Sequence, residues 1–213
     1  MTYANQALTG LTASQAANLL RSGELTAVEY AEALIEQAEK IASLNAFISF
    51  DADAVRTQAR AADDRRRAGE RLGPLHGIPL AIKDNIDTAD LPTTAGTPGL
   101  RHHRPRNNAL VVQRLLDAGA ILFGKNNLHE LAYGVTTNNR AFGASRNPYD
   151  LQRVPGGSSG GTAAAVCARV VPAGIGTDTG ASIRLPMAFC GGVGFRPSVG
   201  RWPQQGLIPA SNT

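Results

Sequence analysis

Hydrophobic residues in the first 70 positions recur mainly at the three- and four-residue spacing of helices. The clearest run follows Thr26, a residue type that commonly caps helices. Its apolar members are Val28, Ala31, Leu34 and Ile35. Residues 12–20 predict a shorter helix, and residues 51–69 predict a polar helix rich in alanine and arginine. Residues 46–50 alternate between apolar and polar positions, which is typical of a strand.

After residue 70 the pattern changes to short apolar runs separated by helical segments. The runs at residues 78–83, 121–124 and 170–175 predict buried strands. Residues 108–119 predict a helix capped by Asn108, and residues 162–169 predict a helix of small residues. Strands that alternate with helices favour an α/β fold, in which helices cover the faces of a sheet.

Composition narrows the class of protein. The chain has 213 residues, of which 43% are hydrophobic but only 5% are aromatic, so the core must consist mainly of alanine, valine, leucine and isoleucine. The net charge of +4 comes largely from two basic runs, at residues 65–67 and 101–106. We expect the first on a solvated helix face and the second in an exposed loop. No base-reading element accompanies them, so no direct nucleic-acid partner is predicted.

Cysteine usage and the absence of long apolar runs indicate a cytoplasmic protein. Cys167 and Cys190 form no CxxC pair and lie among apolar neighbours, so we expect buried free thiols in a reducing compartment. No apolar run reaches the roughly 18 residues that span a membrane. The first residues lack the basic and apolar regions of a secretory leader.

The glycine- and serine-rich segment 156–162 is the first candidate for chemistry. A flexible linker is disfavoured because the segment leads directly into a helix. A phosphate-binding loop would need a Lys-Ser/Thr pair or a dinucleotide-binding spacing. Residues 156–160 match the G-x-S-x-G nucleophile elbow, but no apolar strand precedes them and all four histidines come before Ser158. If Ser158 or its neighbour is activated, the base is therefore not histidine.

A second turn and one lysine complete the candidate chemistry. Residues 174–184 form a turn that follows a predicted strand. The backbone N–H groups of this turn could stabilise an oxyanion. A purely structural turn explains the same sequence equally well. Lys83 ends the strand 78–83, on the face that carries small residues. A partly buried lysine has a lowered pKa and can act as a neutral base, whereas a lysine at a strand end can also simply reach solvent.

Together these segments resemble one enzyme family. Residues 156–161 and 176–184 resemble the two halves of the amidase signature, and residues 82–85 resemble the catalytic-lysine segment of the same family. The motifs follow the order of that family. The resemblance implies the amidase-signature fold, a mixed β-sheet flanked by helices on both faces. It also implies a single domain over residues 1–213, with a helical segment 1–70 and a catalytic core 71–213.

The resemblance implies a Ser-Ser-Lys mechanism. Ser182 corresponds to the nucleophile, Ser158 to a bridging serine held by a cis Gly157–Ser158 peptide, and Lys83 to the base. Ser182 follows Ser158 by 24 positions, a separation that favours Ser158 over Ser159. The implied oxyanion hole uses the backbone N–H groups of Thr179, Gly180, Ala181 and Ser182. The implied support residues are Gly157, Ser159, Asp178 and Arg184. No metal or organic cofactor is needed.

Two departures from the family pattern affect this expectation. Ala181 stands where the family usually has a glycine, and at positive φ it would cost on the order of 1 kcal/mol. Met187 and Gly192 are also unusual at their positions. Residues 206–213 stop in mid-pattern, so we expect the sequence to be a fragment of a longer chain.

The leading functional expectation is hydrolysis of a small carboxamide to a carboxylic acid and ammonia through an acyl-enzyme. Residues 194–201 resemble the mandelamide and indoleacetamide hydrolases of that family. One alternative is the amidase subunit of a tRNA-dependent amidotransferase, which would need partner subunits. Another is an inactive fragment that acts as a folding or interaction module. The expected partner is a small amide substrate, with no membrane and no nucleic acid bound directly; a homodimer is a further expectation.

Overall fold

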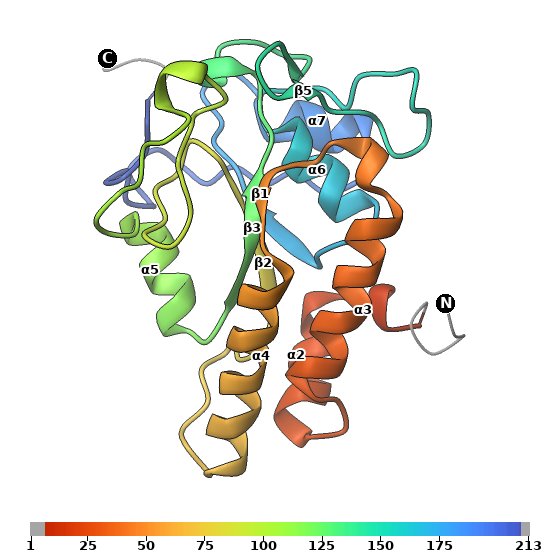
Figure 1. Ribbon diagram of the computed structural model, residues 1–213, viewed down its shortest axis with the longest axis vertical. Coiled ribbons are helices and arrows are strands. Elements are labelled where there is room, and N and C mark those ends of the chain that lie inside the picture. The colour runs from red at the N-terminus through yellow and green to blue at the C-terminus, as the bar shows by residue number, and fades with distance from the viewer. Residues whose placement is uncertain (1–6, 210–213) are drawn as a thin grey trace.

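The computed structural model describes residues 7–209, and its centre is a four-stranded sheet in the order β1-β3-β2-β6 (Figure 1). The strands are β1 (Phe47–Phe50), β2 (Pro79–Lys83), β3 (Ile121–Asn126) and β6 (Ala173–Ile175). β1 runs antiparallel to β3, whereas β2 runs parallel to both β3 and β6. The sheet is therefore mixed, as the family resemblance implied, and β1 from the first 70 residues belongs to it.

Three helices precede or follow β1, and each begins at a side chain that caps it. Thr12 and Thr26 form capping boxes at the starts of α2 (Ala13–Ser22) and α3 (Ala27–Lys40). Asp51 accepts hydrogen bonds from the first turn of α4 (Ala52–Arg67). These three helices confirm the helices that the spacing of apolar residues predicted.

The remaining elements are shorter. The helices are α5 (Leu110–Asp117), α6 (Gly160–Cys167) and α7 (Arg184–Phe189). Single 3₁₀ turns occur at Ala42–Leu44, Pro98–Leu100 and Glu130–Ala132, and a small hairpin pairs β4 (Asn138–Asn139) with β5 (Gly143–Ala144).

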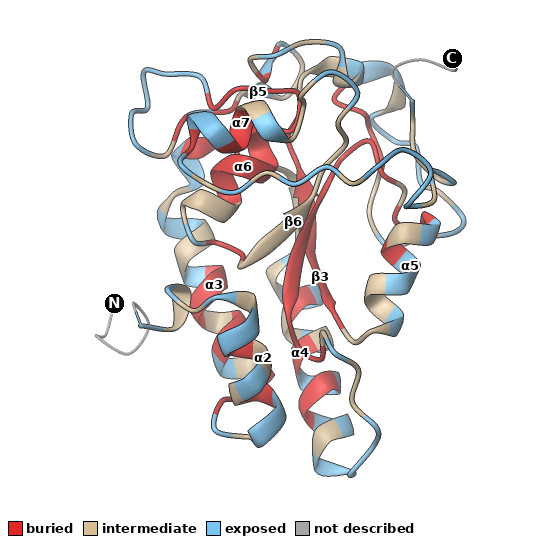
Figure 2. Cartoon of the chain, turned by 180° about the vertical axis from the view of Figure 1, so that it is seen from behind, coloured by how far each residue is buried: buried red, intermediate tan, exposed pale blue. Residues whose placement is uncertain are grey.

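Helices cover both faces of the sheet, which confirms the predicted architecture. The larger core packs α2, α3, α4 and α6 against one face, and a smaller one packs α5 against the other. Figure 2 shows β3 buried between these layers and β6 of intermediate burial, with exposed residues on the outer sides of the helices. Aliphatic residues dominate both cores. A cluster of Phe47, Phe50 and Phe123, with ring centroids 5.0 to 5.8 Å apart, is the main aromatic contribution.

The structure corrects one local prediction. Asn108 does not cap α5: its side-chain oxygen accepts the N–H of Ala89 at 2.8 Å, and the residue before the helix is Ala109. Lys83 ends β2, in which every residue is buried. A register shift in the pairing of β2 with β3 leaves Phe123 of β3 as the extra residue.

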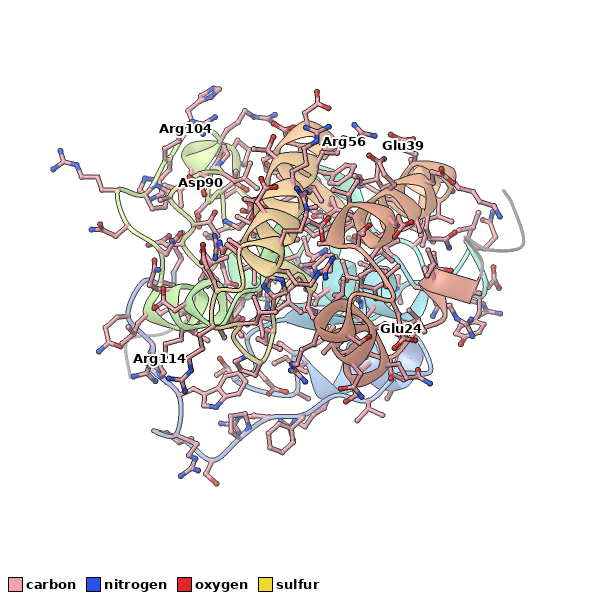
Figure 3. The ribbon with its side chains drawn as sticks, turned by 90° about the horizontal axis from the view of Figure 1, so that it is seen from below. Glu24, Glu39, Arg56, Asp90, Arg104 and Arg114 are labelled. Atoms are coloured by element: carbon pink, nitrogen blue, oxygen red, sulfur yellow. The ribbon has the colours of Figure 1, made fainter. Side chains whose placement is uncertain are left out.

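The surface agrees with the charge pattern. Residues 101–106 form a largely exposed loop. Its Arg104 donates a hydrogen bond to the Asp90 carbonyl oxygen at 3.2 Å, and both residues are labelled in Figure 3. Both cysteines are free, but only Cys190 is buried, since Cys167 is half-buried. Among the helices of residues 7–209, none combines the length and apolar character needed to cross a bilayer.

Contacts between α3 and α4 fix the start of α3. The Asp63 carboxylate on α4 accepts the N–H groups of Ala27 at 2.8 Å and Val28 at 3.1 Å, and Asp63 is 5% exposed. An anion at a helix N-terminus satisfies free N–H groups and interacts favourably with the helix dipole. Arg56, labelled in Figure 3, adds an ion pair from α4 to Glu32 on α3 at 2.8 Å.

Asp63→Ala should therefore lower the free energy of unfolding by about 1–2 kcal/mol, because two buried N–H groups lose their acceptor. Asp64→Ala is the matched control. Asp64 is exposed, and its ion pair among the described residues is with Arg67, so its loss should change stability by no more than about 0.5 kcal/mol. Urea unfolding of both variants measures the difference. Equal effects would show that the cap contributes no more than the surface ion pair.

Candidate active site

Three separate segments meet at the carboxyl ends of β2 and β6. Lys83 is the last residue of β2, and Thr177 follows the end of β6 by two residues. Ser158 lies two residues before the start of α6, next to the N-cap residue Ser159. Because β2 and β6 are parallel neighbours, their carboxyl ends open at one edge of the sheet, where α/β proteins commonly bind ligands.

Lys83 is fully buried, with its amine held by hydroxyl and carbonyl oxygens. Its Nζ lies 2.7 Å from Ser158 Oγ and 2.7 Å from Thr177 Oγ1, and 3.4 Å from the Thr177 carbonyl oxygen. Burial lowers the pKa of Lys83 to about 7, although the negative charge of Asp178 opposes this effect. A large fraction of the amine is therefore neutral near pH 7.

A second buried lysine has a different environment. Lys125, on the neighbouring strand β3, lies 3.0 Å from Asp84, and both side chains are completely buried. Asp84 also accepts hydrogen bonds from the backbone and hydroxyl of Thr94. Lys125 is thus held in a buried ion pair with Asp84. Lys83, in contrast, has no carboxylate within 4 Å of its amine among residues 7–209.

The loop that carries Ser158 is closely packed by other backbone. The Gly157–Ser158 peptide is cis, as the resemblance implied. The N–H of His129 donates to the Ser158 carbonyl oxygen at 3.1 Å, and the Thr137 hydroxyl donates to the Gly156 carbonyl oxygen at 2.7 Å. A Cβ at Gly157 would lie 2.8 Å from the backbone nitrogen of Thr136, so no other residue fits here without movement.

Ser182 lies in the turn before α7 and faces the same cavity as Ser158. The N–H of Ser159 donates to the Ser182 carbonyl oxygen at 3.1 Å, and the Ser159 hydroxyl donates to the Thr177 carbonyl oxygen at 3.2 Å. Both Ser158 and Ser182 line a cavity of about 800 Å³. No hydrogen bond joins their hydroxyl groups in residues 7–209. Catalytic hydrogen bonds are often long in the free protein and shorten when substrate binds.

Asp178 organises the turn around Ser182. Its carboxylate accepts the N–H groups of Ala181 at 2.8 Å and Ile183 at 3.1 Å, and two bonds from the Arg184 guanidinium at 2.9 and 3.0 Å. Burial alone would raise the pKa of Asp178, but the Arg184 guanidinium and the backbone N–H groups hold it below its usual range. Asp178 and Arg184 thus form the pair that the sequence predicted.

This geometry changes the predicted oxyanion hole. Because the Ala181 N–H donates to Asp178, it is not free to bind an oxyanion. The N–H groups of Thr179, Gly180 and Ser182 have no acceptor within the described part of the chain. The predicted set of four donors is therefore reduced to three candidates.

The two unusual positions in this region also have structural explanations. Ala181 has φ +101°, a conformation that favours glycine, so the alanine is strained as anticipated. A Cβ at Gly192 would lie 2.3 Å from Met187 Cε and 2.7 Å from Cys167 Sγ. A side chain at position 192 would therefore require the ends of the Met187 and Cys167 side chains to move.

Two residues at the site received no individual role from the sequence. Thr177 binds the Lys83 amine through its hydroxyl, and Asn85 Nδ2 donates to that hydroxyl at 3.3 Å and to the Ile208 carbonyl oxygen at 3.2 Å. Both lie inside the motif segments, but motif membership alone does not reveal contacts across more than 90 positions. Within residues 7–209, no group of three or more His, Cys, Asp or Glu side chains could hold a metal ion.

Comparison with known proteins places this site in a family. The profile of the Amidase family matches residues 29–213. This chain belongs to the amidase family. The match covers most of the chain and includes all three segments of the candidate site.

Relatives of this amidase-family chain fall into two functional groups. It is 51% identical over 199 residues to a glutamyl-tRNA(Gln) amidotransferase subunit from Chloroflexus aggregans, covering 93% of the chain and 41% of the relative. It is 46% identical over 200 residues to an indoleacetamide hydrolase from Agrobacterium vitis, and the alignment covers 94% of this chain and 42% of that relative. Among solved structures, peptide amidase from Stenotrophomonas maltophilia aligns with a TM-score of 0.88 at 37% identity. This alignment covers 94% of this chain and 42% of the peptide amidase. The chain thus spans about two fifths of the length of these relatives.

The stability of this amidase-family chain should depend on pH through Lys83. The folded pKa is about 7, whereas the unfolded value is about 10.4, so the unfolded state binds more protons between these limits. The free energy of unfolding should then rise with pH, relative to Lys83→Met, by about 1 kcal/mol per pH unit from pH 7.5 to 9. Urea unfolding across this range tests the slope. Lys40→Met removes an exposed lysine. Its free energy of unfolding should depend on pH in the same way as that of the wild type.

Ala181→Gly should separate backbone strain from the ordinary effect of glycine. At φ +101° the substitution removes strain of about 1 kcal/mol, which offsets the greater entropy of glycine in the unfolded chain. Ala188→Gly, at an exposed position of α7, should instead cost about 1 kcal/mol because the helix has no strain to relieve. Thermal or urea unfolding compares the two. Equal losses of stability would contradict the strain at Ala181.

Proposed function

We propose that this chain hydrolyses the C–N bond of a small carboxamide, with Ser182 as nucleophile, Ser158 as proton bridge and Lys83 as base. The observation that carries the proposal is the 2.7 Å contact between the buried Lys83 amine and Ser158 Oγ, on a cavity that Ser182 also lines. A neutral amine can accept the proton of a serine hydroxyl, and burial favours the neutral form.

Acylation follows from this order of groups. Ser182 Oγ attacks the carbonyl carbon of the amide while its proton passes to Ser158 Oγ, whose own proton passes to Lys83 Nζ. The tetrahedral intermediate collapses when the C–N bond breaks. Ser158 then protonates the departing nitrogen and recovers a proton from Lys83. Ammonia leaves, and the acyl group remains on Ser182.

Deacylation uses the same relay with water as nucleophile. Water attacks the acyl carbon as its proton passes through Ser158 to Lys83. Collapse of this second intermediate releases the carboxylic acid and returns the proton to Ser182. During both steps the N–H groups of Thr179, Gly180 and Ser182 are the candidates to hold the oxyanion.

The cavity favours a neutral substrate with an apolar acyl group. Phe195, Trp202 and Met187 line it. Among the described lining residues the only carboxylate, that of Asp178, is paired with Arg184 and also lies 4.0 Å from the Arg196 guanidinium. Apolar pockets with a few fixed polar groups suit small organic ligands. The similarity to an indoleacetamide hydrolase supports an arylacetamide as the substrate class. A cytoplasmic location belongs to the same proposal.

The second candidate function is that of the amidase component in an amidotransferase. It is supported by the 51% identity to the glutamyl-tRNA(Gln) amidotransferase subunit from Chloroflexus aggregans. This function would require partner subunits, and their co-purification with the chain would favour it. A module without activity is the third candidate, supported by the strained Ala181 in the nucleophile turn.

A fluorophosphonate probe, which reacts with activated serines, tests the proposed function. We expect labelling of the wild-type chain, loss of labelling in Ser182→Ala, and a decrease of at least about 100-fold in Lys83→Met, since general-base catalysis contributes about that much. The labelling rate should rise as the pH increases through about 7, when Lys83 loses its proton.

Ser198→Ala controls for non-specific reaction, because Ser198 is an exposed serine at the rim of the same cavity. Its labelling should equal that of the wild type. Absence of wild-type labelling at pH 8 would favour the inactive module. Labelling that persists in Ser182→Ala would contradict the assignment of the nucleophile.

A further inference from the structure

One buried polar atom on the wall of the cavity has no partner. Asn85 lines the cavity and is 2% exposed, yet its Oδ1 accepts no hydrogen bond within residues 7–209. A buried amide oxygen without a donor costs free energy, and such atoms are rare in folded proteins. Thus the oxygen is an unused acceptor at the candidate active site.

The orientation of the Asn85 amide follows from its neighbours. Its nitrogen lies 3.2 Å from the Ile208 carbonyl oxygen, which can only accept hydrogen bonds. The N–H of Ile208 in turn donates to the Asn85 carbonyl oxygen of the backbone at 2.8 Å, so the segment is fixed on both sides. Exchange of the side-chain oxygen and nitrogen would bring two acceptors together. Oδ1 is therefore the atom of the amide that is left without a donor.

Asn85 is also connected to the reacting groups. Its Nδ2 shares the Thr177 hydroxyl with the Lys83 amine, at 3.3 and 2.7 Å, and Lys83 reaches Ser158 Oγ at 2.7 Å. An amide nitrogen that receives a proton from Ser158 must enter this part of the cavity. Its N–H groups then leave water and need an acceptor.

We propose that Asn85 is a substrate-binding residue whose Oδ1 accepts a hydrogen bond from an N–H group on the nitrogen of the amide to be cleaved. The inference rests on the proposed function and adds a basis for substrate selectivity. Because the site recognises the leaving nitrogen, an amide should bind more tightly than an ester of the same acid. An ester carries oxygen at this position and offers no hydrogen to Asn85.

A matched pair of ligands tests this contact without any need for turnover. N-methyl-2-phenylacetamide and methyl phenylacetate differ only at one position, where the amide has an N–H group and the ester has an oxygen atom. The Ser182→Ala substitution prevents acylation of the chain by either ligand. Isothermal titration of the Ser182→Ala chain should show about 5- to 10-fold tighter binding of the amide, as expected for one hydrogen bond. Adding Asn85→Leu should reduce this ratio to about 1.

Asn126→Leu in the same background is the control. Asn126 is fully buried on β3 and also has an unpartnered Oδ1, but it does not line the cavity. Its substitution should leave the ratio of the two affinities unchanged. Asn85→Ala serves as a second variant, and cooperative thermal unfolding shows that each variant is folded.

Three outcomes would overturn the inference: equal affinity for the two ligands while Asn85 is present, the same preference for the amide after Asn85→Leu or Asn85→Ala, and no saturable binding of either ligand. Failure of the proposed function would appear separately, as absent probe labelling at Ser182. The ligand comparison keeps its meaning in that case because it uses a chain that cannot react.

Discussion

The burial of Lys83 without a carboxylate beside it is the constraint on which the rest of the site depends. Lys125 on the adjacent strand is equally buried, but Asp84 lies 3.0 Å from its amine and compensates its charge. Lys83 instead contacts the hydroxyl groups of Ser158 and Thr177, which accept hydrogens without supplying negative charge. Desolvation therefore lowers its pKa to about 7, and its proton can exchange near neutral pH.

The fold maintains this environment by burying the two central strands, β2 and β3. The parallel pairing of β2 with β3 and β6 brings the end of β2 beside the segment that follows β6. Helices on both sides cover these central strands, whereas β1 and β6 are half-buried. The serine turns need less of this protection, because Asp178 arranges one of them through five hydrogen bonds of its own. The base depends on the core of the protein, whereas the nucleophile depends on a local carboxylate.

Local features were predictable from the sequence, and long-range ones were not. Helix starts at Thr26 and Asp51 could be predicted because the caps act within three residues. Asn108 failed as a cap because the N–H of Ala89, 19 positions away, competes for its side chain. The strain at Ala181 was foreseeable from the residue type expected there. The bond from Asn85 to Thr177 crosses 92 positions, and no periodicity or spacing indicates it.

The contact between Met187 and Gly192 has an evolutionary consequence. Since a Cβ at position 192 would lie 2.3 Å from the end of the Met187 side chain, the two positions are not independent. A side chain at position 192 fits only if the end of the Met187 side chain and the Cys167 Sγ, at 2.7 Å, both move or become smaller. Substitution at position 192 is thus coupled to the rotamers and sizes of residues 187 and 167, which lie 5 and 25 positions before it in the chain.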